Sequence, residues 1–441
     1  MASEQAQKTL VIEPPNEKQK LFFLADRRFV AYGGARGGGK SWAVRRKAEL
    51  LALNYPGIRI LFLRRTLKEL RENHLDTMRV DLSGIATFRE VDAKFQFYNG
   101  STIKMGYCDN EKDVLQYQGQ EYDIIFLDEA TQFTEWQFLM ILSCLRGAND
   151  FPKRFYLTCN PGGVGHGWVK RLFIDREYRD GEDPDDYVFI QAKLSDNKVL
   201  METDPAYAQM LDRLPPDIRR AWRDGDWNVF LGQYFPEFGE LHVEELPRPP
   251  KSWARYAAID YGLDALAFYL AAMEPNGRVH VYREIYAVGR LIREAAKMVK
   301  AGAGEELGMV YAPPDLWNRR QDTGKSVADI FAEEGVYLVR VSNDRVTGWL
   351  EVKEKLQLTE DGRPGLVIDK SCRELIKSFP YLLVDDKNPG DVANEPHEYT
   401  HGPDAIRYLL AGRPRPAESD AELEIERGYT EEFDSWMDFG R

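Results

Sequence analysis

The stretch GGARGGGKSW, residues 33–42, constrains the fold of this chain more than any other feature. It follows the apolar run RFVAY and precedes SWAVRRKAELLALNY, whose apolar spacing is helical. Residues Gly34 to Ser41 match the pattern G-x-x-x-x-G-K-[S/T] in full. In such a loop, glycines let backbone N–H groups close around phosphate oxygens, and the helix N-terminus adds partial positive charge. The sequence therefore predicts a nucleoside triphosphate site between a strand and a helix.

Individual residues of this loop have expected tasks. We expect Lys40 to reach the β and γ phosphates and the Ser41 hydroxyl to bind Mg²⁺. Arg36 lies inside the loop, where its guanidinium could neutralise charge on the γ phosphate. The alternative is that Arg36 only pairs with a nearby carboxylate. The glycines expected to approach the nucleotide are Gly34, Gly37 and Gly39.

A second apolar strand ends in two carboxylates, in the sequence IIFLDE from residue 124 to residue 129. Asp128 is expected to hold Mg²⁺ through water, and Glu129 to activate the attacking water. The alternative is that both residues only cap a helix. With the glycine loop, the pair predicts hydrolysis of a nucleoside triphosphate and not phosphoryl transfer to a small molecule.

Three further positions could serve the same site, each with a simpler alternative. Gln19, in NEKQKLFF, could bind adenine with its amide or be an ordinary surface glutamine. Thr158 and Asn160, in LTCNPGG, could sense the γ phosphate or only start a turn. Arg64 and Arg65 end the strand IRILFL and could face DNA or nucleotide, or form a solvated basic turn.

The rest of the first half supports a mostly parallel α/β sheet. RFVAY, IRILFLR, YDIIFLDE and KRFYLTCN read as short buried strands, with helical patterns between them. KFQFYNGSTIKMGY alternates apolar and polar residues around Asn99-Gly100, which predicts an antiparallel hairpin with a type I′ turn at the sheet edge. At 441 residues the chain is too long for one ordinary core.

A second domain is predicted after a proline-rich stretch. Residues 235–253, FPEFGELHVEELPRPPKSW, hold four prolines and little periodicity. New strands follow, including ARYAAID and RVHVYREIYAVG, and HGPDAIRYLLAG reads as a late helix. We expect a first domain over residues 1–235, a linker over 236–253, a second α/β domain over 254–412 and an acidic tail over 413–441.

This second part has no glycine loop but carries carboxylates at strand and helix ends. Asp260 ends the strand RYAAID, Asp315 follows the strand-like MVYAPP, and Asp404 begins a helix. Three carboxylates brought together can hold two divalent cations that activate water for phosphodiester cleavage. An aspartate on the first strand of an antiparallel start, with another on a late helix, is the ribonuclease H-like pattern, although Asp404 could simply cap its helix. Additional candidates are Asp264, Glu284, Glu398 and His401.

Composition narrows the class of protein. The net charge of −13 argues against a protein that simply coats DNA, which would be basic. Four scattered cysteines without C-x-x-C spacing predict a reduced, cytosolic protein. The sequence shows no signal-peptide core at its start and no run of 18 apolar residues, so no membrane partner is expected.

Taken together, these motifs resemble the large terminase subunit of tailed bacteriophages. The resemblance rests on GGARGGGKS, IIFLDEA, TCNP, and the later series AIDYG, YAPPDLW and HGPDAIRY, and covers roughly residues 15–412. DRLPPDIRRAWRDGDWNVFLGQYF also resembles the closing part, or lid segment, of that family's ATPase domain. The resemblance implies an N-terminal P-loop NTPase domain followed by a C-terminal ribonuclease H-like α/β nuclease domain.

The resemblance also implies a function. Large terminases are DNA-packaging motors, in which ATP hydrolysis drives double-stranded viral DNA through a portal into a procapsid, while a metal-dependent endonuclease cuts the concatemer to start and end packaging. The implied cofactors are ATP and Mg²⁺, with Mn²⁺ as a second metal for the nuclease site. The implied partners are double-stranded DNA, the portal protein, the small terminase subunit and further copies in a ring. The implied location is the host cell cytoplasm, and not the mature virion.

Residue by residue, Lys40, Ser41, Asp128 and Glu129 match the family's phosphate, metal and base positions, and Arg36 matches an arginine often found in its loop. Asp260 and Asp404 match the first and last nuclease carboxylates. The family often shows Ala-Asp-Pro near the middle carboxylate, where this chain has Ala-Pro-Pro-Asp, so the assignment moves two residues to Asp315. His401-Gly402-Pro403 stands where the family often carries paired acids.

Two other classes of protein remain as alternatives. A cellular helicase-nuclease of DNA repair would carry a second motor domain, for which the residues between Trp227 and Trp253 leave no room. A DNA-binding assembly protein with an inactive nuclease half is the other alternative, and the retention of all three aspartates speaks against it.

Overall fold

The computed structural model describes residue 10 and residues 12–230, 232–262, 264–304, 308–320 and 324–413. These residues form two compact units. Unit 1 contains the chain up to Pro236 together with residues 377–400, and unit 2 contains residues 237–376 and the chain from His401. Apart from Arg413, the predicted acidic tail lies outside the described residues.

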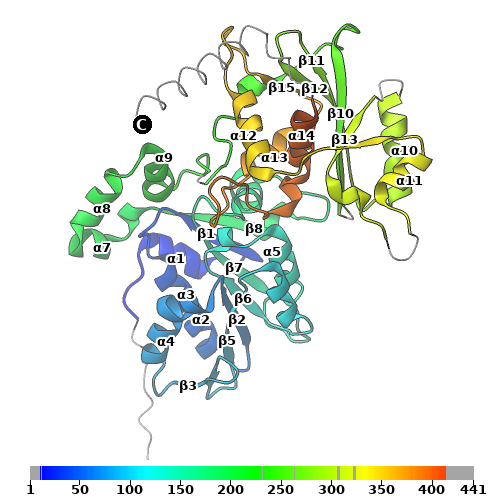
Figure 1. Ribbon diagram of the computed structural model, residues 1–441. Coiled ribbons are helices and arrows are strands. Elements are labelled where there is room, and N and C mark those ends of the chain that lie inside the picture. Colours follow the sequence, from blue (N-terminus) through cyan, green and yellow to red (C-terminus); the bar gives the residue numbers. More distant parts are fainter. Residues whose placement is uncertain are drawn as a thin grey trace, which may run out of the picture. The chain divides into compact units, whose positions relative to one another are not determined.

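Unit 1 is built on an eight-stranded sheet in the order β3-β4-β5-β2-β6-β7-β1-β8 (Figure 1). The six strands from β5 to β8 in this order are parallel. Because β7 lies between β1 and β6, the segments that follow these three strands meet at one edge of the sheet. The strands are β1 (Phe29–Gly34), β2 (Arg59–Arg64), β3 (Ala86–Arg89), β4 (Lys94–Phe97), β5 (Thr102–Tyr107), β6 (Ile124–Leu127), β7 (Arg154–Cys159) and β8 (Tyr187–Ala192).

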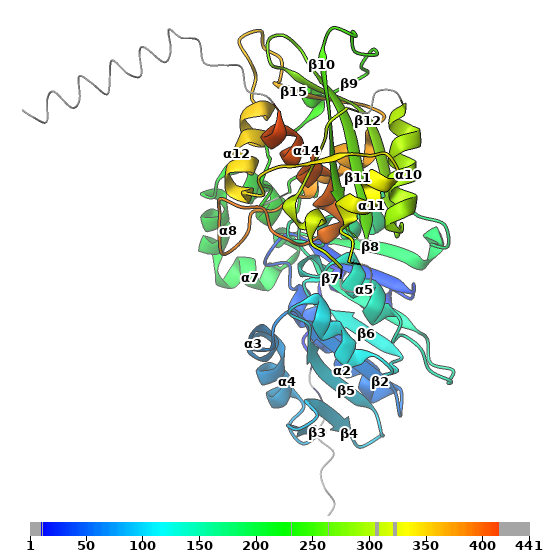
Figure 2. The ribbon, with the colours of Figure 1, turned by 45° about the vertical axis from the view of Figure 1, so that its right-hand side comes forward.

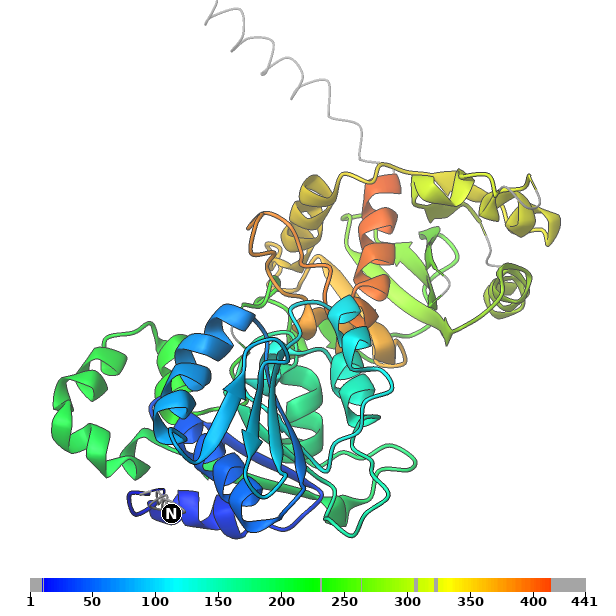
Figure 3. The ribbon, with the colours of Figure 1, turned by 90° about the horizontal axis from the view of Figure 1, so that it is seen from below.

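Helices cover both faces of this sheet, as Figure 3 shows. Apolar residues of α1 to α4 pack on one face, and those of α5, α6 and the π-helical turn η4 on the other. The helices are α1 (Glu17–Leu24), α2 (Lys40–Asn54), α3 (Leu67–Leu70), α4 (Asp76–Asp81), α5 (Glu135–Leu142), α6 (His166–Val169), α7 (Lys198–Thr203), α8 (Pro205–Asp212) and α9 (Pro216–Arg219). Three π-helical turns extend them, η1 (Arg71–Leu75), η4 (Lys170–Asp175) and η7 (Arg220–Asp224).

The predicted edge hairpin is present, but its turn differs from the prediction. Strands β4 and β5 pair antiparallel, with β3 beyond them. A type I′ turn needs positive φ at both central residues, and here only Gly100, with φ of 87°, has it. The Asn99 amide instead donates to the carbonyls of Ala52 and Leu53 at the end of α2. Asn99 thus caps the C-terminus of α2. The connection between β4 and β5 is therefore not a two-residue type I′ turn.

Residues 377–400, which were predicted to belong to the second domain, pack in unit 1. The Tyr234 backbone N–H donates to the Leu382 carbonyl at 2.7 Å, and the Phe235 ring meets the Phe379 ring edge-on at 5.5 Å. The Tyr381 ring lies 4.6 Å from the Tyr399 ring. Aromatic packing between segments that are distant in sequence therefore holds residues 377–400 in unit 1.

Unit 2 contains a seven-stranded sheet in the order β14-β13-β10-β11-β12-β15-β9. Strands β10, β11 and β12 form an antiparallel meander, and β13 and β14 continue parallel to β10. This is a ribonuclease H-like order, so the predicted fold class of both halves is confirmed. The strands are β9 (Val243–Glu244), β10 (Ala254–Tyr261), β11 (Ala265–Met273), β12 (Val279–Val288), β13 (Val310–Ala312), β14 (Leu338–Arg340) and β15 (Leu366–Asp369).

Alternation along β10 decides which face receives each side chain. Ala257, Ile259 and Tyr261 pack in the core with α10 and α11, so Asp260 points to the opposite face, against which α14 packs (Figure 2). The helices are α10 (Ile292–Ala303), α11 (Val327–Glu333), α12 (Arg345–Leu356), α13 (Arg373–Ser378) and α14 (His401–Gly412).

The stretch over residues 236–253, expected to be a linker, contributes β9, which pairs with β15 in unit 2. Over the described ranges, none of the helices combines the length and the apolar character needed to cross a membrane.

Candidate functional sites

The glycine loop has the backbone that its sequence predicts. Gly34, Gly37 and Gly39 have φ of 127°, 77° and 75°, values that side chains with a Cβ rarely adopt. A Cβ on Gly34 would lie 2.5 Å from the carbonyl oxygen of Ala192, which leaves no room for one. Helix α2 begins directly after the loop, at Lys40. The loop is therefore formed as an anion cradle at a helix N-terminus.

Lys40 is buried inside this cradle. Its ammonium donates to the Ala35 carbonyl at 2.6 Å and to Oδ1 of Asn160 at 2.8 Å. Burial lowers the Lys40 pKa, which the nearby Glu129 carboxylate partly offsets. Ser41 follows in the first turn of α2 and is half-buried. Both acceptors of the ammonium are neutral oxygens, so a phosphate can replace them.

Asp128 is a buried carboxylate of unit 1 that contacts three side-chain donors. Burial opposes its ionisation, but the His74 imidazole and the Arg64 guanidinium hold its pKa well below the usual range. Nε2 of His74 lies 2.7 Å from Oδ2, which also pairs with Nη1 of Arg64. The Thr158 hydroxyl donates to Oδ1 at 2.6 Å. The carboxylate is thus ionised and held at both oxygens.

Glu129 and Asn160 are linked to each other and to Lys40. Glu129 has φ of 56° and ψ of 54°, a left-handed conformation that is uncommon for residues other than glycine and concentrates at functional sites. Its backbone N–H donates to the Thr158 hydroxyl at 2.8 Å. The Asn160 amide donates to Oε2 of Glu129 at 2.7 Å and accepts from Lys40. Asn160 therefore bridges the loop lysine and the carboxylate after β6.

Arg36 stacks on an aromatic ring instead of pairing with a carboxylate. Its guanidinium carbon lies 3.4 Å from the centre of the Trp222 ring, a cation–π contact. Its backbone N–H donates to the Trp222 carbonyl at 2.7 Å. Gly225, three residues further on, lies against the backbone of Gly34 and Ala35. The segment around η7 thus packs directly on the glycine loop.

Gln19 is buried, and its amide is used within the protein. The amide donates to the Gly39 carbonyl at 3.2 Å and accepts from the Asn16 backbone N–H at 2.9 Å, in the capping box of α1. Arg64 is also buried and contacts Asp128, whereas Arg65 is half-buried and lies near Asp109 and the Gln132 carbonyl. Of the two arginines, only Arg64 contacts a proposed nucleotide-site residue.

In unit 2, His401 connects two aspartates. Its Nδ1 lies 2.7 Å from Oδ2 of Asp260, and its Nε2 lies 2.8 Å from Oδ2 of Asp264. Burial raises the Asp260 pKa; the hydrogen bond from His401 lowers it, and the Asp404 and Asp315 charges raise it further. The three predicted aspartates are therefore close enough to influence one another.

Asp404 is held by an arginine one turn later in α14. Nε and Nη2 of Arg407 both donate to Oδ1 of Asp404, at 3.0 and 2.6 Å. Nη2 also donates to Oδ1 of Asn343 at 2.9 Å. Asp315 is exposed and lies in a 3₁₀ turn after β13. The simple capping alternative for Asp404 does not describe this arrangement, in which the carboxylate binds a buried guanidinium.

Two of the additional candidates lie elsewhere. Glu284 accepts from the Glu374 and Leu375 backbone N–H groups at 3.0 and 2.8 Å, and from the Tyr269 hydroxyl. It stabilises the start of α13. Glu398 belongs to unit 1.

The donor chemistry of both sites fits divalent metals. Ser41 and Asp128 offer oxygen ligands, which Mg²⁺ prefers, and so do Asp260, Asp315 and Asp404. In Asp260 and Asp404 the hydrogen bonds described above occupy one oxygen, which leaves the other for a metal.

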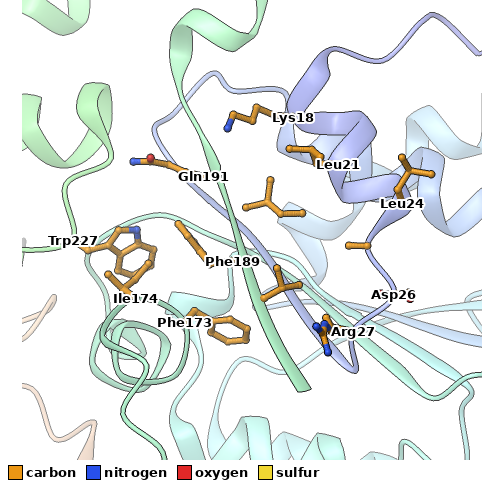
Figure 4. Close-up of a pocket in the computed structure, with 13 residues that line it drawn as sticks. Lys18, Leu21, Leu24, Asp26, Arg27, Phe173, Ile174, Phe189, Gln191 and Trp227 are labelled. Atoms are coloured by element: carbon orange, nitrogen blue, oxygen red, sulfur yellow. The ribbon is translucent and has the colours of Figure 1, made fainter. Parts of the chain in front are cut away.

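A separate cavity of about 780 Å³ lies along the edge strand β8 (Figure 4). Leu21, Leu24, Phe173, Phe189 and Trp227 give it a mainly apolar lining. The glycine loop and the carboxylates of either site do not line it. It is therefore separate from both candidate sites.

Sequence reasoning missed several residues of these sites. The pair Asp404 and Arg407 has i, i+3 spacing on a helix, which could have predicted their contact. Gly225 lies in Asp-Gly-Asp, a turn signal. His74 and Trp222 carry no local signal, because their partners are distant in sequence.

We compared the sequence and the fold of this chain with those of known proteins. Residues 26–226 match the family model described as phage terminase large subunit. No curated protein matches the chain. The large terminase of bacteriophage HK97 is 13% identical, with a TM-score of 0.52 and coverage of 91% of this chain and 95% of that chain.

Two further solved structures are similar at lower scores. The large terminase of a thermophilic bacteriophage, in complex with ADP, is 18% identical, with a TM-score of 0.42 over 90% of this chain and 99% of that chain. The P22 large terminase nuclease domain is 16% identical, with a TM-score of 0.35 over 41% of this chain and 92% of that chain. The family match over the first half and the HK97-like fold over both halves agree: this chain is similar to phage terminase large subunits.

Proposed function

We propose that this chain is the ATP-hydrolysing and DNA-cutting subunit of a phage DNA-packaging motor. One observation carries the proposal: the chain holds two separate acidic centres. Asp128 and Glu129 lie beside Lys40 of the glycine loop in unit 1, and Asp260 and Asp404 lie on β10 and α14 in unit 2. We assign the ATPase to unit 1, with the segment around η7 as its lid, and the nuclease to unit 2.

In unit 1 the loop and Lys40 bind the phosphates of ATP. Ser41, and Asp128 through water, would hold Mg²⁺, which neutralises phosphate charge when it is bound. Glu129 takes a proton from a water whose oxygen attacks the γ phosphorus. The bond from the γ phosphorus to the bridging oxygen breaks, and ADP and phosphate leave.

Three residues beside the nucleotide site, Asn160, Arg36 and Gln19, have proposed roles in nucleotide binding and hydrolysis. A γ phosphate competes with Asn160 for Lys40, which supports the sensor role over a mere turn. Arg36 neutralises γ-phosphate charge once it leaves the Trp222 ring. Gln19 shapes the loop at Gly39, and its amide would have to leave the Gly39 carbonyl to bind adenine.

In unit 2, Asp260, Asp315 and Asp404 would hold Mg²⁺ or Mn²⁺, which would supply a Lewis acid for phosphodiester hydrolysis. His401 and Arg407 fix the orientation of two of these carboxylates. The substrate is double-stranded DNA. The remaining partners are the portal protein, the small terminase subunit and further copies in a ring, and the protein acts in the host cell cytoplasm.

The experiment that tests the ATPase half is Glu129→Gln. This substitution keeps an oxygen that can accept from Asn160 but removes the base. We expect nucleotide affinity near wild type and phosphate release reduced by about 10²–10⁴-fold. Fluorescent-ATP titration and phosphate release measure the two quantities, with exposed Glu202→Gln as the control. Loss of binding in Glu129→Gln, or unchanged turnover, would contradict the assigned role.

A further inference from the structure

His74 is a fully buried histidine to which the proposed mechanism gives no task. It lies in the π-helical turn η1, between α3 and α4, and its ring contacts the Phe62 ring at 4.7 Å. A π-helical turn contains an additional residue, and here both His74 and Leu75 are buried. Such turns occur frequently at functional sites. The π-helical turn therefore brings the His74 imidazole to Asp128, which directly follows β6.

The hydrogen-bond partners fix the proton of this imidazole. A carboxylate can only accept, so the short contact between Nε2 and Oδ2 of Asp128 places the proton on Nε2. Nδ1 is buried and has no partner among the described residues. Nε2 of His74 is therefore the atom that donates to Asp128.

The donors around Asp128 leave one acceptor position open. An ionised carboxylate offers about four lone-pair sites. Arg64 and His74 occupy the two on Oδ2, and Thr158 occupies one on Oδ1. Among the contacts of the described residues, the remaining site is on Oδ1.

We propose that His74 is the positioning residue of Asp128, which keeps one acceptor of Oδ1 open for the water shell of nucleotide-bound Mg²⁺. The arginine alone does not suffice, because a guanidinium prefers to bind both carboxylate oxygens at once. Without the His74 donor, Arg64 can turn onto Oδ1 and cover the open acceptor. This inference rests on the proposed ATPase function of unit 1.

The test compares His74→Phe with His74→Gln in the full chain. Phenylalanine keeps the ring contact with Phe62 and removes the donor, whereas glutamine keeps an N–H that can reach Asp128. We expect His74→Phe to bind a fluorescent ADP analogue like wild type in EDTA, but to need about ten-fold more Mg²⁺ for half-maximal Mg²⁺-dependent binding and turnover. We expect His74→Gln to restore much of the difference.

The matched control is His242→Phe in unit 2. His242 is also buried, and its Nε2 lies 2.8 Å from the Leu356 carbonyl. Its loss removes a comparable hydrogen bond, so thermal stability should fall while the Mg²⁺ requirement stays unchanged. If His74→Phe does not fold, His74→Asn, whose amide is too short to reach Asp128, replaces it in the comparison.

Three results of this experiment would contradict one of the two proposals. An unchanged Mg²⁺ requirement in His74→Phe would overturn the positioning role. Equal losses of affinity with EDTA and with Mg²⁺ would also overturn it, since they indicate a structural role only. Wild-type protein that neither binds nor hydrolyses ATP would instead overturn the proposed function.

Discussion

Gly225 provides a sharp test of the contact between the lid segment and the glycine loop. It lies 191 positions after Gly34 in the sequence, yet a Cβ built on it would lie 2.7 Å from the Ala35 nitrogen and 2.8 Å from the Gly34 carbonyl carbon. An ordinary van der Waals contact begins at 3.4 Å. In Gly225→Ala, the loop or the lid segment must therefore move by about 0.7 Å, because both neighbours are backbone atoms.

The expected magnitude has two parts. Gly225 has φ of 67°, so alanine costs about 1–2 kcal/mol for the left-handed conformation. Crowding of the packed loop adds about 1–3 kcal/mol. Displacement of groups that hold the reacting phosphate lowers turnover steeply, by about 10²-fold for a shift near 1 Å. We expect Gly225→Ala to lose stability, and to lose ATP turnover by more than the stability loss explains.

Gly181→Ala is the matched control. Gly181 has φ of 90°, and nothing lies within 4 Å of its added Cβ. It therefore shows the backbone cost without the clash. Urea unfolding gives the stability of both variants, and phosphate release on the folded protein gives their turnover. If Gly225→Ala turns over ATP as fast as Gly181→Ala, the packing of the lid segment on the loop does not matter for the reaction.

The remaining predictions concern pH and the independence of the two sites. His166 is buried, its Nδ1 accepts from the Gly162 N–H at 2.8 Å, and burial lowers its pKa to about 4 from 6.5. The folded state therefore binds the proton less well than the unfolded state, and stability present above pH 6.5 is lost as pH falls towards 4. Between pH 7 and pH 5, wild type should lose about 2 kcal/mol more unfolding free energy than His166→Gln, measured by urea unfolding at both pH values; equal losses would refute the assignment. Lys40→Ala should abolish ATP hydrolysis and leave DNA cutting largely intact, and loss of both activities would contradict two separate sites.

Much of unit 1 could be predicted because its signals are local. The strands around IRILFL and IIFL are short apolar runs, and the loop at residues 34–41 combines glycines, a lysine and a serine at fixed spacing. Strand β8 was missed, because YVFIQA is only half-buried at the sheet edge and shows no clear alternation. The hairpin turn type was wrong, because Asn99 bonds to a helix end that the local sequence does not reveal.

The parts that could not be predicted depend on contacts between distant segments. His74 looks like a polar helix residue, but tertiary packing buries it beside Asp128. Arg36 was expected to meet phosphate or a carboxylate, and the fold places it on Trp222. In unit 2 the aspartates were assigned from strand and helix ends, and the bond from Arg407 to Asp404 was missed although its i, i+3 spacing is local.

The measurement that tests the account most directly is cleavage of supercoiled plasmid with Mg²⁺ or Mn²⁺, by wild type and by Asp260→Ala. The account predicts nicking and linearisation by wild type and their loss in the variant, with ATP hydrolysis retained in both. Absence of cleavage by wild type with either metal would contradict a nuclease in unit 2. It would leave an ATPase with an acidic second unit, as in a DNA-binding assembly protein.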